Sequence, residues 1–178
     1  MEALLKTWAG EEVIIRFDQP TGAWIFIAIH STKLGPATGG TRMKPYPAWE
    51  AALADVLQLA AGMTRKFALA GLAHGGGKAV IALPPDFDAT QRTALLQRYG
   101  TLIQQLGGLY HTGPDVGTTA EDMDIIAETG APYVHSRTPL KGGAGASGPA
   151  TARGVFAAMQ ATCERLFGDA ALAGRRVV

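Results

Sequence analysis

Apolar residues divide the chain into strand-like and helix-like segments. Two β-branched and aromatic runs, 12–18 and 24–30, flank a Pro-Thr-Gly turn and predict an antiparallel hairpin. The segment 33–47 is interpreted as a loop, because it is so rich in glycine and proline that regular structure throughout it is not expected. After Pro47, apolar residues at three- and four-residue spacing predict a helix. They are Leu53, Val56, Leu57, Ala60 and Met63.

The second half of the chain alternates short strands with helices. Strands are predicted at 79–83, 109–112 and, weakly, 133–135. One helix begins at an Asp88 cap and stops at Gly107, and the next has capping-box spacing at Thr118 and Glu121. A flexible loop at 141–149 precedes a last helix that closes at Gly168, and 172–178 should be a turn that enters a strand. The alternation indicates an α/β fold, and the hairpin makes its sheet mixed.

Composition narrows the function classes. A formal charge of +1 gives no field that would attract nucleic acid or an anionic membrane. No apolar run approaches the roughly 20 residues of a membrane span, and the first residues do not resemble a signal peptide. Cys163 is the only cysteine, so no intramolecular disulfide can form. These features favour a cytoplasmic protein.

Three charged residues at the ends of predicted elements are candidate site residues. Lys66 ends the first helix, Lys78 follows Gly75-Gly76-Gly77, and Asp115 lies between a strand and a helix. The triple glycine would let the backbone approach a small molecule and would leave Lys78 without steric cover. A lysine desolvated near a second cation has a lowered pKa and can act as a base. The ordinary alternatives are a solvated helix-end lysine and a turn or cap carboxylate.

Other motifs carry less chemistry. Gly77-Lys78 is not a phosphate loop, because Leu72 occupies the place of its first glycine. The run 143–148 matches G-x-G-x-x-G, but no hydrophobic strand precedes it as a dinucleotide site requires. The four histidines and Cys163 lack metal-ligand spacing, so no metal is expected. His74, next to the triple glycine, is the one histidine expected to line a pocket, and Cys163 is expected in the core.

Five stretches together resemble the substrate-domain motifs of the Glu/Leu/Phe/Val dehydrogenases, in order and at compatible spacing. They are Leu34 to Met43, Ala61 to Lys66, Gly75 to Lys78, Thr112 to Thr118, and Glu121 to Asp124. The likeness runs over essentially the whole chain. It implies an α/β, mixed-sheet, three-layer substrate domain with a leading hairpin in residues 1–148. Residues 149–178 would be a linking helix and the start of a Rossmann domain.

The resemblance implies an oxidoreductase that deaminates an L-amino acid to a 2-oxo acid and ammonia, with hydride passing to NAD. By position, Lys78 would be the general base that activates water, and Asp115 would exchange protons with the substrate nitrogen. Lys66 would bind the substrate carboxylate. The remaining positions carried over are Gly39, Gly40 and Met63 beside that carboxylate, Gly113 in the side-chain pocket, and Thr151 near the nicotinamide.

The sequence stops inside the predicted first Rossmann strand. We therefore expect the 178 residues alone to fold and to bind amino acid weakly, but to bind NAD poorly and not to turn over. The early hairpin resembles the family's oligomerisation edge, which implies a homo-oligomer. Two alternatives remain: a non-catalytic amino-acid-binding or oligomerising homologue, and a small nucleotide-binding protein that uses residues 143–148.

The amino acid itself stays open between leucine, valine and phenylalanine. Gly113 stands where leucine-type enzymes have an alanine that narrows the pocket, and Thr38 and residues 141–145 look closer to phenylalanine dehydrogenases. Residues 116–119 look closer to leucine dehydrogenases. A single pocket methylene gives only about 1–3 kcal/mol of discrimination. These signals favour a large apolar or aromatic side chain without deciding between the candidates.

Overall fold

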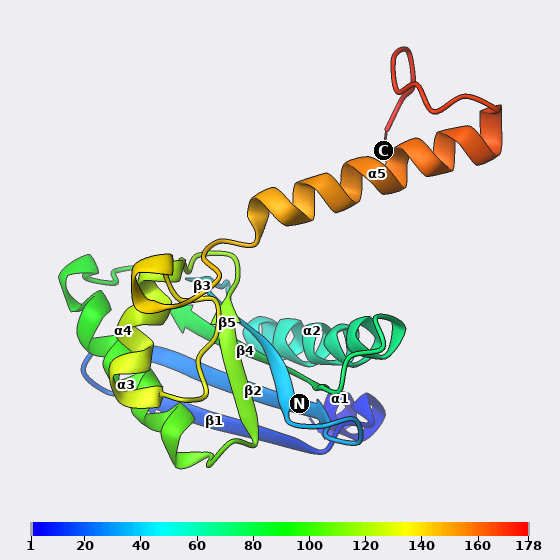
Figure 1. Ribbon diagram of the computed structural model, residues 1–178. Helices are drawn as coiled ribbons and strands as arrows, with labels where there is room; N and C mark the ends of the chain where they lie inside the picture. The colour runs from blue at the N-terminus through cyan, green and yellow to red at the C-terminus, as the bar shows by residue number, and fades with distance from the viewer. Residues whose placement is uncertain (1, 178) are drawn as a thin grey trace. The chain divides into compact units, whose positions relative to one another are not determined.

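The computed structural model describes residues 2–177, which form two compact units that divide between Gly145 and Ala146. The first unit contains a single five-stranded sheet (Figure 1). Its strands are β1 (Glu12–Asp18), β2 (Ala23–Ser31), β3 (Ala37–Pro45), β4 (Gly75–Leu83) and β5 (Tyr110–Pro114). Their order across the sheet is β1-β2-β4-β3-β5.

The sheet is mixed, as the sequence predicts. β1 pairs with β2 and β2 with β4 in antiparallel fashion, whereas β3 runs parallel to both β4 and β5. The carboxyl ends of β3 and β5 therefore meet at one edge, where ligands bind in many α/β proteins.

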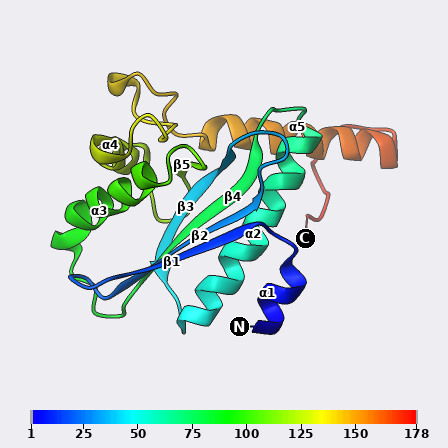
Figure 2. The ribbon, with the colours of Figure 1, turned by 90° about the horizontal axis from the view of Figure 1, so that it is seen from below.

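Helices cover both faces of this sheet and give three layers (Figure 2). On one face lies α2 (Trp49–Leu69), with α1 (Glu2–Trp8) beside it. The other face carries α3 (Arg92–Gln105), which follows the 3-10 turn η1 (Ala89–Gln91), and α4 (Ala120–Gly130). The sequence pattern did not predict α1. Its last residue, Trp8, anchors it by donating its Nε1–H to the carbonyl of Leu57 at 2.8 Å.

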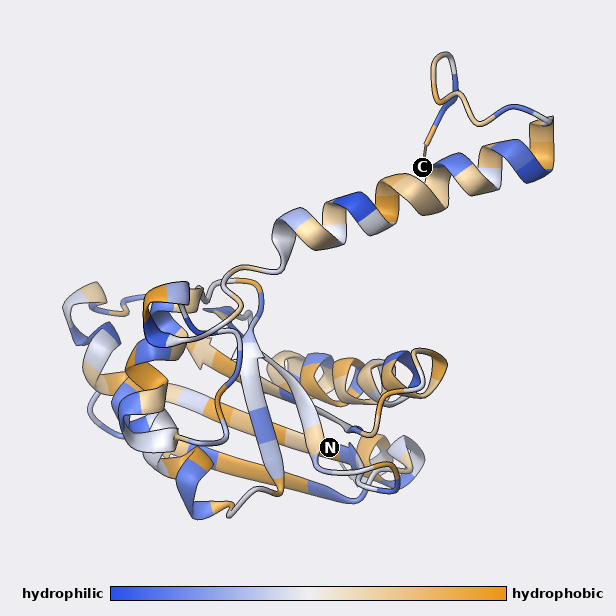
Figure 3. Ribbon diagram, viewed as in Figure 1, coloured by the Kyte–Doolittle hydropathy of each residue, from blue (hydrophilic) through white to orange (hydrophobic). Residues whose placement is uncertain are grey.

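The strands β2 and β4 are buried on both faces and separate two apolar clusters. Odd-numbered β2 residues, including Ile25, Ile27 and Ile29, pack towards α3 and α4. Phe26 and Ala28 pack towards α2. Burial on both sides explains why the sequence of β2 is mostly apolar without alternating polar residues. The hydrophobic residues of this strand are orange in Figure 3.

Two expectations need correction. The segment 33–47 contains the nine-residue strand β3, with Gly39 and Gly40 fully inside the sheet. Pairing with β4 and β5 outweighs the low strand propensity of glycine. The capping box of α4 uses Thr119 and Asp122 and not the residues predicted. The Thr118 hydroxyl has another role, because it donates to the Thr41 carbonyl at 2.8 Å.

Smaller differences concern element ends. β4 begins at Gly75, four residues before the predicted strand, because the triple glycine pairs with β2 and β3. The predicted strand at 133–135 reduces to one bridge between Thr112 and Val134. Asp88 caps η1 rather than the helix itself.

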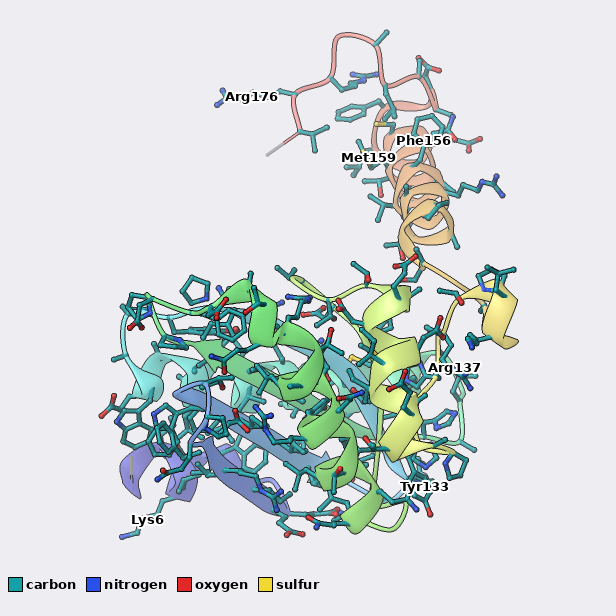
Figure 4. The ribbon with its side chains drawn as sticks, turned by 90° about the vertical axis from the view of Figure 1, so that its left-hand side faces the viewer. Lys6, Tyr133, Arg137, Phe156, Met159 and Arg176 are labelled. Atoms are coloured by element: carbon teal, nitrogen blue, oxygen red, sulfur yellow. The ribbon has the colours of Figure 1, made fainter. Side chains whose placement is uncertain are left out.

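The second unit consists of α5 (Gly148–Phe167) and the residues up to 177. As predicted, α5 ends at Gly168 in a left-handed conformation, and Cys163 is buried. Residues 172–177 contain a turn but no strand, and Val178 lies outside the described residues. An apolar cavity of about 530 Å³ lies between α5 and this tail, and its lining includes Met159 and Leu172. Figure 4 labels Met159 on α5 and Arg176 in the tail. Within residues 2–177 no helix is long and apolar enough to span a membrane.

Candidate active site

The triple glycine of β4 is required by protein packing. A Cβ at Gly75 would lie 2.1 Å from the Ser31 carbonyl oxygen, and one at Gly76 would lie 2.2 Å from the Thr64 backbone nitrogen. At Gly77 it would meet the Tyr110 ring at 2.8 Å. The sequence predicted that a small molecule would approach the backbone at these glycines. Strand β2, helix α2 and the Tyr110 ring occupy that space instead.

Lys78 follows these glycines and is buried, with 5% of its surface exposed, so the expectation of a lysine free of steric cover is wrong. It lies two residues before Val80 and therefore on the same face of β4, the face on which Val80 packs in the α2-side cluster. Its Nζ lies 3.2 Å from Oδ1 of Asp115. Burial is the largest influence on the pKa of Lys78 and lowers it. The positive charges of Arg42 and Lys66 act in the same direction, and the attraction of Asp115 opposes them without reversing the shift.

Asp115 lies just beyond β5 and uses both carboxylate oxygens. Oδ1 faces Lys78, and Oδ2 accepts a hydrogen bond from Nε of Arg42 at 2.9 Å. Partial burial raises the pKa of Asp115, but the Lys78 ammonium and the Arg42 guanidinium outweigh it, so the net pKa is lowered. Asp115 is therefore a carboxylate at neutral pH and contacts two cations.

Arg42 extends this network to α2, and the sequence reading did not identify it as a site residue. Its Nη1 donates to both carboxylate oxygens of Asp55, at 2.9 and 3.1 Å, and the Tyr46 hydroxyl donates to Oδ2 of the same carboxylate. The sequence signal that could have identified Arg42 is its position directly after Gly39-Gly40-Thr41. Its partner on α2 could not be identified without the fold.

Hydrogen bonds to β3 hold the loop that carries Asp115. The Asp115 amide donates to Oγ1 of Thr118 at 2.9 Å, and Thr118 in turn donates to the Thr41 carbonyl. The Met43 amide donates to the Val116 carbonyl at 2.9 Å. The carboxylate thus lies at the end of a loop fastened to the neighbouring strand.

Beneath the loop, buried hydroxyl groups join β3, β5 and α3. Oγ1 of Thr41 lies 2.6 Å from both the Tyr99 hydroxyl and Oγ1 of Thr112. The Tyr110 hydroxyl donates to the Gly39 carbonyl at 2.7 Å. Burial raises the pKa of Tyr99 to about 12, so this phenol stays neutral and its role is structural.

The residues expected beside a substrate carboxylate lie around the same strands. A Cβ at Gly39 would lie 3.4 Å from Cγ of Met63, and one at Gly40 would lie 3.0 Å from Cβ of Asp115. Lys66 is exposed in the last turn of α2, near enough for its charge to act on Lys78. Gly40 therefore lies against Asp115 and Met63 lies near Gly39, while Lys66 acts on Lys78 through its charge.

Gly113 has an unexpected neighbour. A Cβ at this position would lie 2.2 Å from Cε1 and 2.6 Å from Nδ1 of His135. The His135 ring thus occupies the space into which an alanine at 113 would project. The sequence reading treated His135 as an ordinary polar residue, and no local signal relates the two positions, 22 residues apart.

Thr151 and two of the histidines complete the account of the residues considered from the sequence. Thr151 belongs to α5, in the second unit. His30 pairs with Thr64 at 2.9 Å, and Nδ1 of His74 lies 3.1 Å from Oγ1 of Thr38. In the described part of the chain, no group of three or more His, Cys, Asp and Glu residues is placed to hold a metal ion.

The arrangement combines a fixed carboxylate with a lysine of lowered pKa. Such a lysine has a larger neutral fraction at physiological pH than a free lysine and can take a proton from water. The ionised Asp115 can receive a proton from an ammonium group. The exposed ammonium of Lys66 can bind an anion, so the site suits a small molecule with both charges.

Comparison with known proteins places these residues in context. The family model described as "Glu/Leu/Phe/Val dehydrogenase, dimerisation domain" matches residues 19–132. A valine dehydrogenase from Streptomyces virginiae is 48% identical over 167 residues, covering 94% of this chain and 46% of that protein. A leucine dehydrogenase from Geobacillus stearothermophilus is 46% identical over 173 residues, covering 97% of this chain and 46% of that protein.

A solved structure also matches almost the whole chain. The L-tryptophan dehydrogenase from Nostoc punctiforme superposes with a TM-score of 0.72 at 35% identity, covering 97% of this chain and 48% of that one. The chain therefore spans less than half the length of these relatives.

Proposed function

The chain belongs to the Glu/Leu/Phe/Val dehydrogenase family, and from this premise we propose that it is the substrate-binding half of an NAD-dependent L-amino-acid dehydrogenase. The reaction is oxidative deamination of an apolar L-amino acid to its 2-oxo acid and ammonia. Residues 1–148 bind and act on the amino acid, and residues 149–178 form the linking helix and the start of a cofactor domain.

The charge balance around Lys78 carries this proposal. With Lys78 protonated, Lys66, Lys78 and Arg42 supply three positive charges, and Asp55 and Asp115 supply two negative charges. One positive charge is thus left over among these five side chains, on the exposed ammonium of Lys66. The carboxylate of an amino acid would neutralise it, while the substrate nitrogen would face the ionised Asp115.

Each site residue has one role in the proposed reaction. Lys66 binds the substrate carboxylate, and Asp115 accepts a proton from the substrate ammonium so that the nitrogen lone pair is free. On the imine that oxidation leaves, the neutral Lys78 amine takes a proton from water as the water oxygen bonds to the imine carbon. Asp115 returns its proton to the nitrogen. The Asp115 carboxylate, ionised again, then takes the proton of the new hydroxyl group as the C–N bond breaks, which gives the 2-oxo acid and ammonia.

The oxidant is proposed to be NAD, which accepts the hydride in the complete enzyme. The described residues do not form a dinucleotide cradle, because the glycine-rich run before α5 follows the 3-10 turn η2 (Pro139–Lys141) and not a strand. We therefore expect the 178 residues alone to bind NAD weakly or not at all. Thr151 is proposed to approach the nicotinamide.

The substrate is proposed to carry an apolar branched-chain or aromatic side chain. Relatives named valine, leucine and tryptophan dehydrogenase support this class. Gly113 and His135 together are proposed to form one wall of the side-chain pocket, which makes its shape depend on both residues.

A second copy of the chain is the proposed partner. The matched family model describes a dimerisation domain. The edge strand β1 exposes Ile15 and Phe17, and the Phe17 ring packs on the exposed Trp24 at 4.8 Å between centroids. An apolar edge of this kind suits pairing with another subunit.

Calorimetric titration of the chain tests the function. L-valine, L-leucine, L-phenylalanine and their 2-oxo acids should bind, and Lys66→Met should weaken binding by roughly ten- to a hundredfold, the loss expected for one charge-assisted hydrogen bond. Lys33→Met removes an exposed lysine outside the site and is the matched control. No binding at millimolar ligand, or equal binding by Lys66→Met and the control, would overturn the proposal.

A further inference from the structure

Arg42 lies between two carboxylates that come from different elements. Its Nε donates to Oδ2 of Asp115, and its Nη1 donates to Asp55 on α2. The Arg42 side chain is only 20% exposed, so these bonds are made largely away from water. Only a planar guanidinium can make both contacts in fixed directions, because a lysine presents a single charged atom.

Asp55 and Tyr46 hold this guanidinium from the far side. The Tyr46 hydroxyl donates to Asp55, and Asp55 accepts from Arg42 through both oxygens. The chain of contacts therefore runs from Tyr46 through Asp55 and Arg42 to Asp115, and from there to Lys78 at 3.2 Å. All members other than Lys78 and Asp115 lie outside the proposed chemistry.

We propose that Arg42 is a positioning residue: held by Asp55 and Tyr46, it fixes one oxygen of Asp115 so that the other oxygen faces Lys78. This inference rests on the proposed function, since it concerns the same proton-transferring pair. Without Arg42, the Asp115 side chain could rotate about its terminal torsion and exchange its two oxygens. With Arg42 bound, only Oδ1 is available to Lys78 or to a substrate nitrogen.

Electrostatics supports the geometric argument. The charged groups that act on the Lys78–Asp115 pair are Arg42 from β3 and Lys66 from α2. Asp55 from α2 and Tyr46 after β3 face Arg42 and not the pair itself. Arg42 is among the causes that hold the pKa of Asp115 below its ordinary value, and it also lowers the pKa of Lys78. Asp55 carries the opposite charge to Arg42, so Arg42 orients Asp115 without adding net charge to the site.

The test is a carbon-detected NMR titration of the Asp115 carboxyl group in the isotopically labelled chain, assigned with Asp115→Asn. In the wild type, the midpoint of the carboxyl should lie below that of an ordinary aspartate. In Arg42→Gln its midpoint should rise by about one unit, a tenfold change in proton affinity. Arg42→Lys keeps the charge but not the planar guanidinium, so its midpoint should lie between those of the wild type and Arg42→Gln.

The control is Arg98→Gln, which removes an arginine from the Asp18 ion pair of β1 and α3 and should leave the Asp115 titration unchanged. Because Arg42→Gln leaves Asp55 without its cation, the double variant Arg42→Gln/Asp55→Asn serves if the single variant does not fold, and the same rise is expected. An unchanged Asp115 midpoint in a folded variant that lacks Arg42 would overturn the inference.

The two proposals fail separately. If ligands bind the wild type but removal of Arg42 does not move the Asp115 midpoint, Arg42 is only structural and the dehydrogenase proposal stands. If the midpoint moves but the wild type binds no amino or 2-oxo acid, the positioning contact is real and the proposed function is wrong.

Discussion

Gly76→Ala tests how closely α2 packs against strand β4 of the sheet. The added Cβ would lie 2.0 Å from Oγ1, 2.2 Å from the backbone nitrogen and 2.5 Å from Cα of Thr64. Rotation of the threonine side chain could relieve the first contact but not the other two. Since ordinary contacts begin near 3.4 Å, α2 would have to retreat from β4 by about 1 Å.

Overpacking of a close-packed core costs typically 1–3 kcal/mol, and a clash with backbone belongs at the upper end. A loss of about 3 kcal/mol would lower the melting temperature by about 6–12 °C in a protein of this size. Because Lys66 and Met63 belong to the same helix, its retreat also displaces them from Lys78. A 1 Å misplacement of this kind can cost about a hundredfold in activity, so ligand binding should weaken by more than tenfold.

Gly62→Ala is the matched control, since it makes the same chemical change within α2 where a Cβ would meet nothing within 4 Å. It should stabilise the chain by up to about 1 kcal/mol, because alanine is the better helix former, and leave binding unchanged. Thermal unfolding and calorimetric titration of the two variants provide the comparison. Wild-type stability and binding in Gly76→Ala would refute the contact between α2 and β4 on which the site depends.

Three further predictions concern single contacts. Gly113→Ala should lose about 1–3 kcal/mol of unfolding free energy by overpacking, and His135→Ala in the same chain should restore much of it; a double-mutant cycle in urea without coupling would contradict the contact. Asp18, paired with Arg98, has a pKa lowered because its hydrogen bonds outweigh the effect of burial. It should therefore contribute stability above about pH 4 that is lost as pH falls through its folded value. Urea midpoints at pH 6 and pH 3 should differ less in Asp18→Asn than in the wild type, and an equal difference would contradict this assignment. Thr119→Ala should cost about 1 kcal/mol through loss of the α4 capping box, and an unchanged urea midpoint would show that the cap contributes nothing.

Elements with strong apolar periodicity can be predicted from the sequence. The hairpin of β1 and β2 and the helices α2 and α5 have regular spacing and clear turn or cap residues, and they occur where expected. β3 cannot be predicted in this way, because its glycines disfavour an isolated strand and only pairing with β4 and β5 stabilises it.

The same distinction applies to the site. Lys78 and Asp115 stand in conspicuous local motifs, so sequence alone identifies them as candidates. Arg42, Asp55 and His135 do not, because their importance comes from partners on other elements. The triple glycine shows a further limit: its sequence signal is strong, but the neighbours that require it are protein atoms, which only the fold reveals.

The central claim is that Lys66, Lys78 and Asp115 form one site for a small zwitterion. Backbone amide NMR shifts of the labelled chain during titration with an apolar L-amino acid test it most directly. The largest shifts should fall at Gly39, Gly40 and residues 76–78 and 115–118, and Lys66→Met should remove them. Shifts confined to residues 146–177, or a map that Lys66→Met leaves unchanged, would contradict the claim.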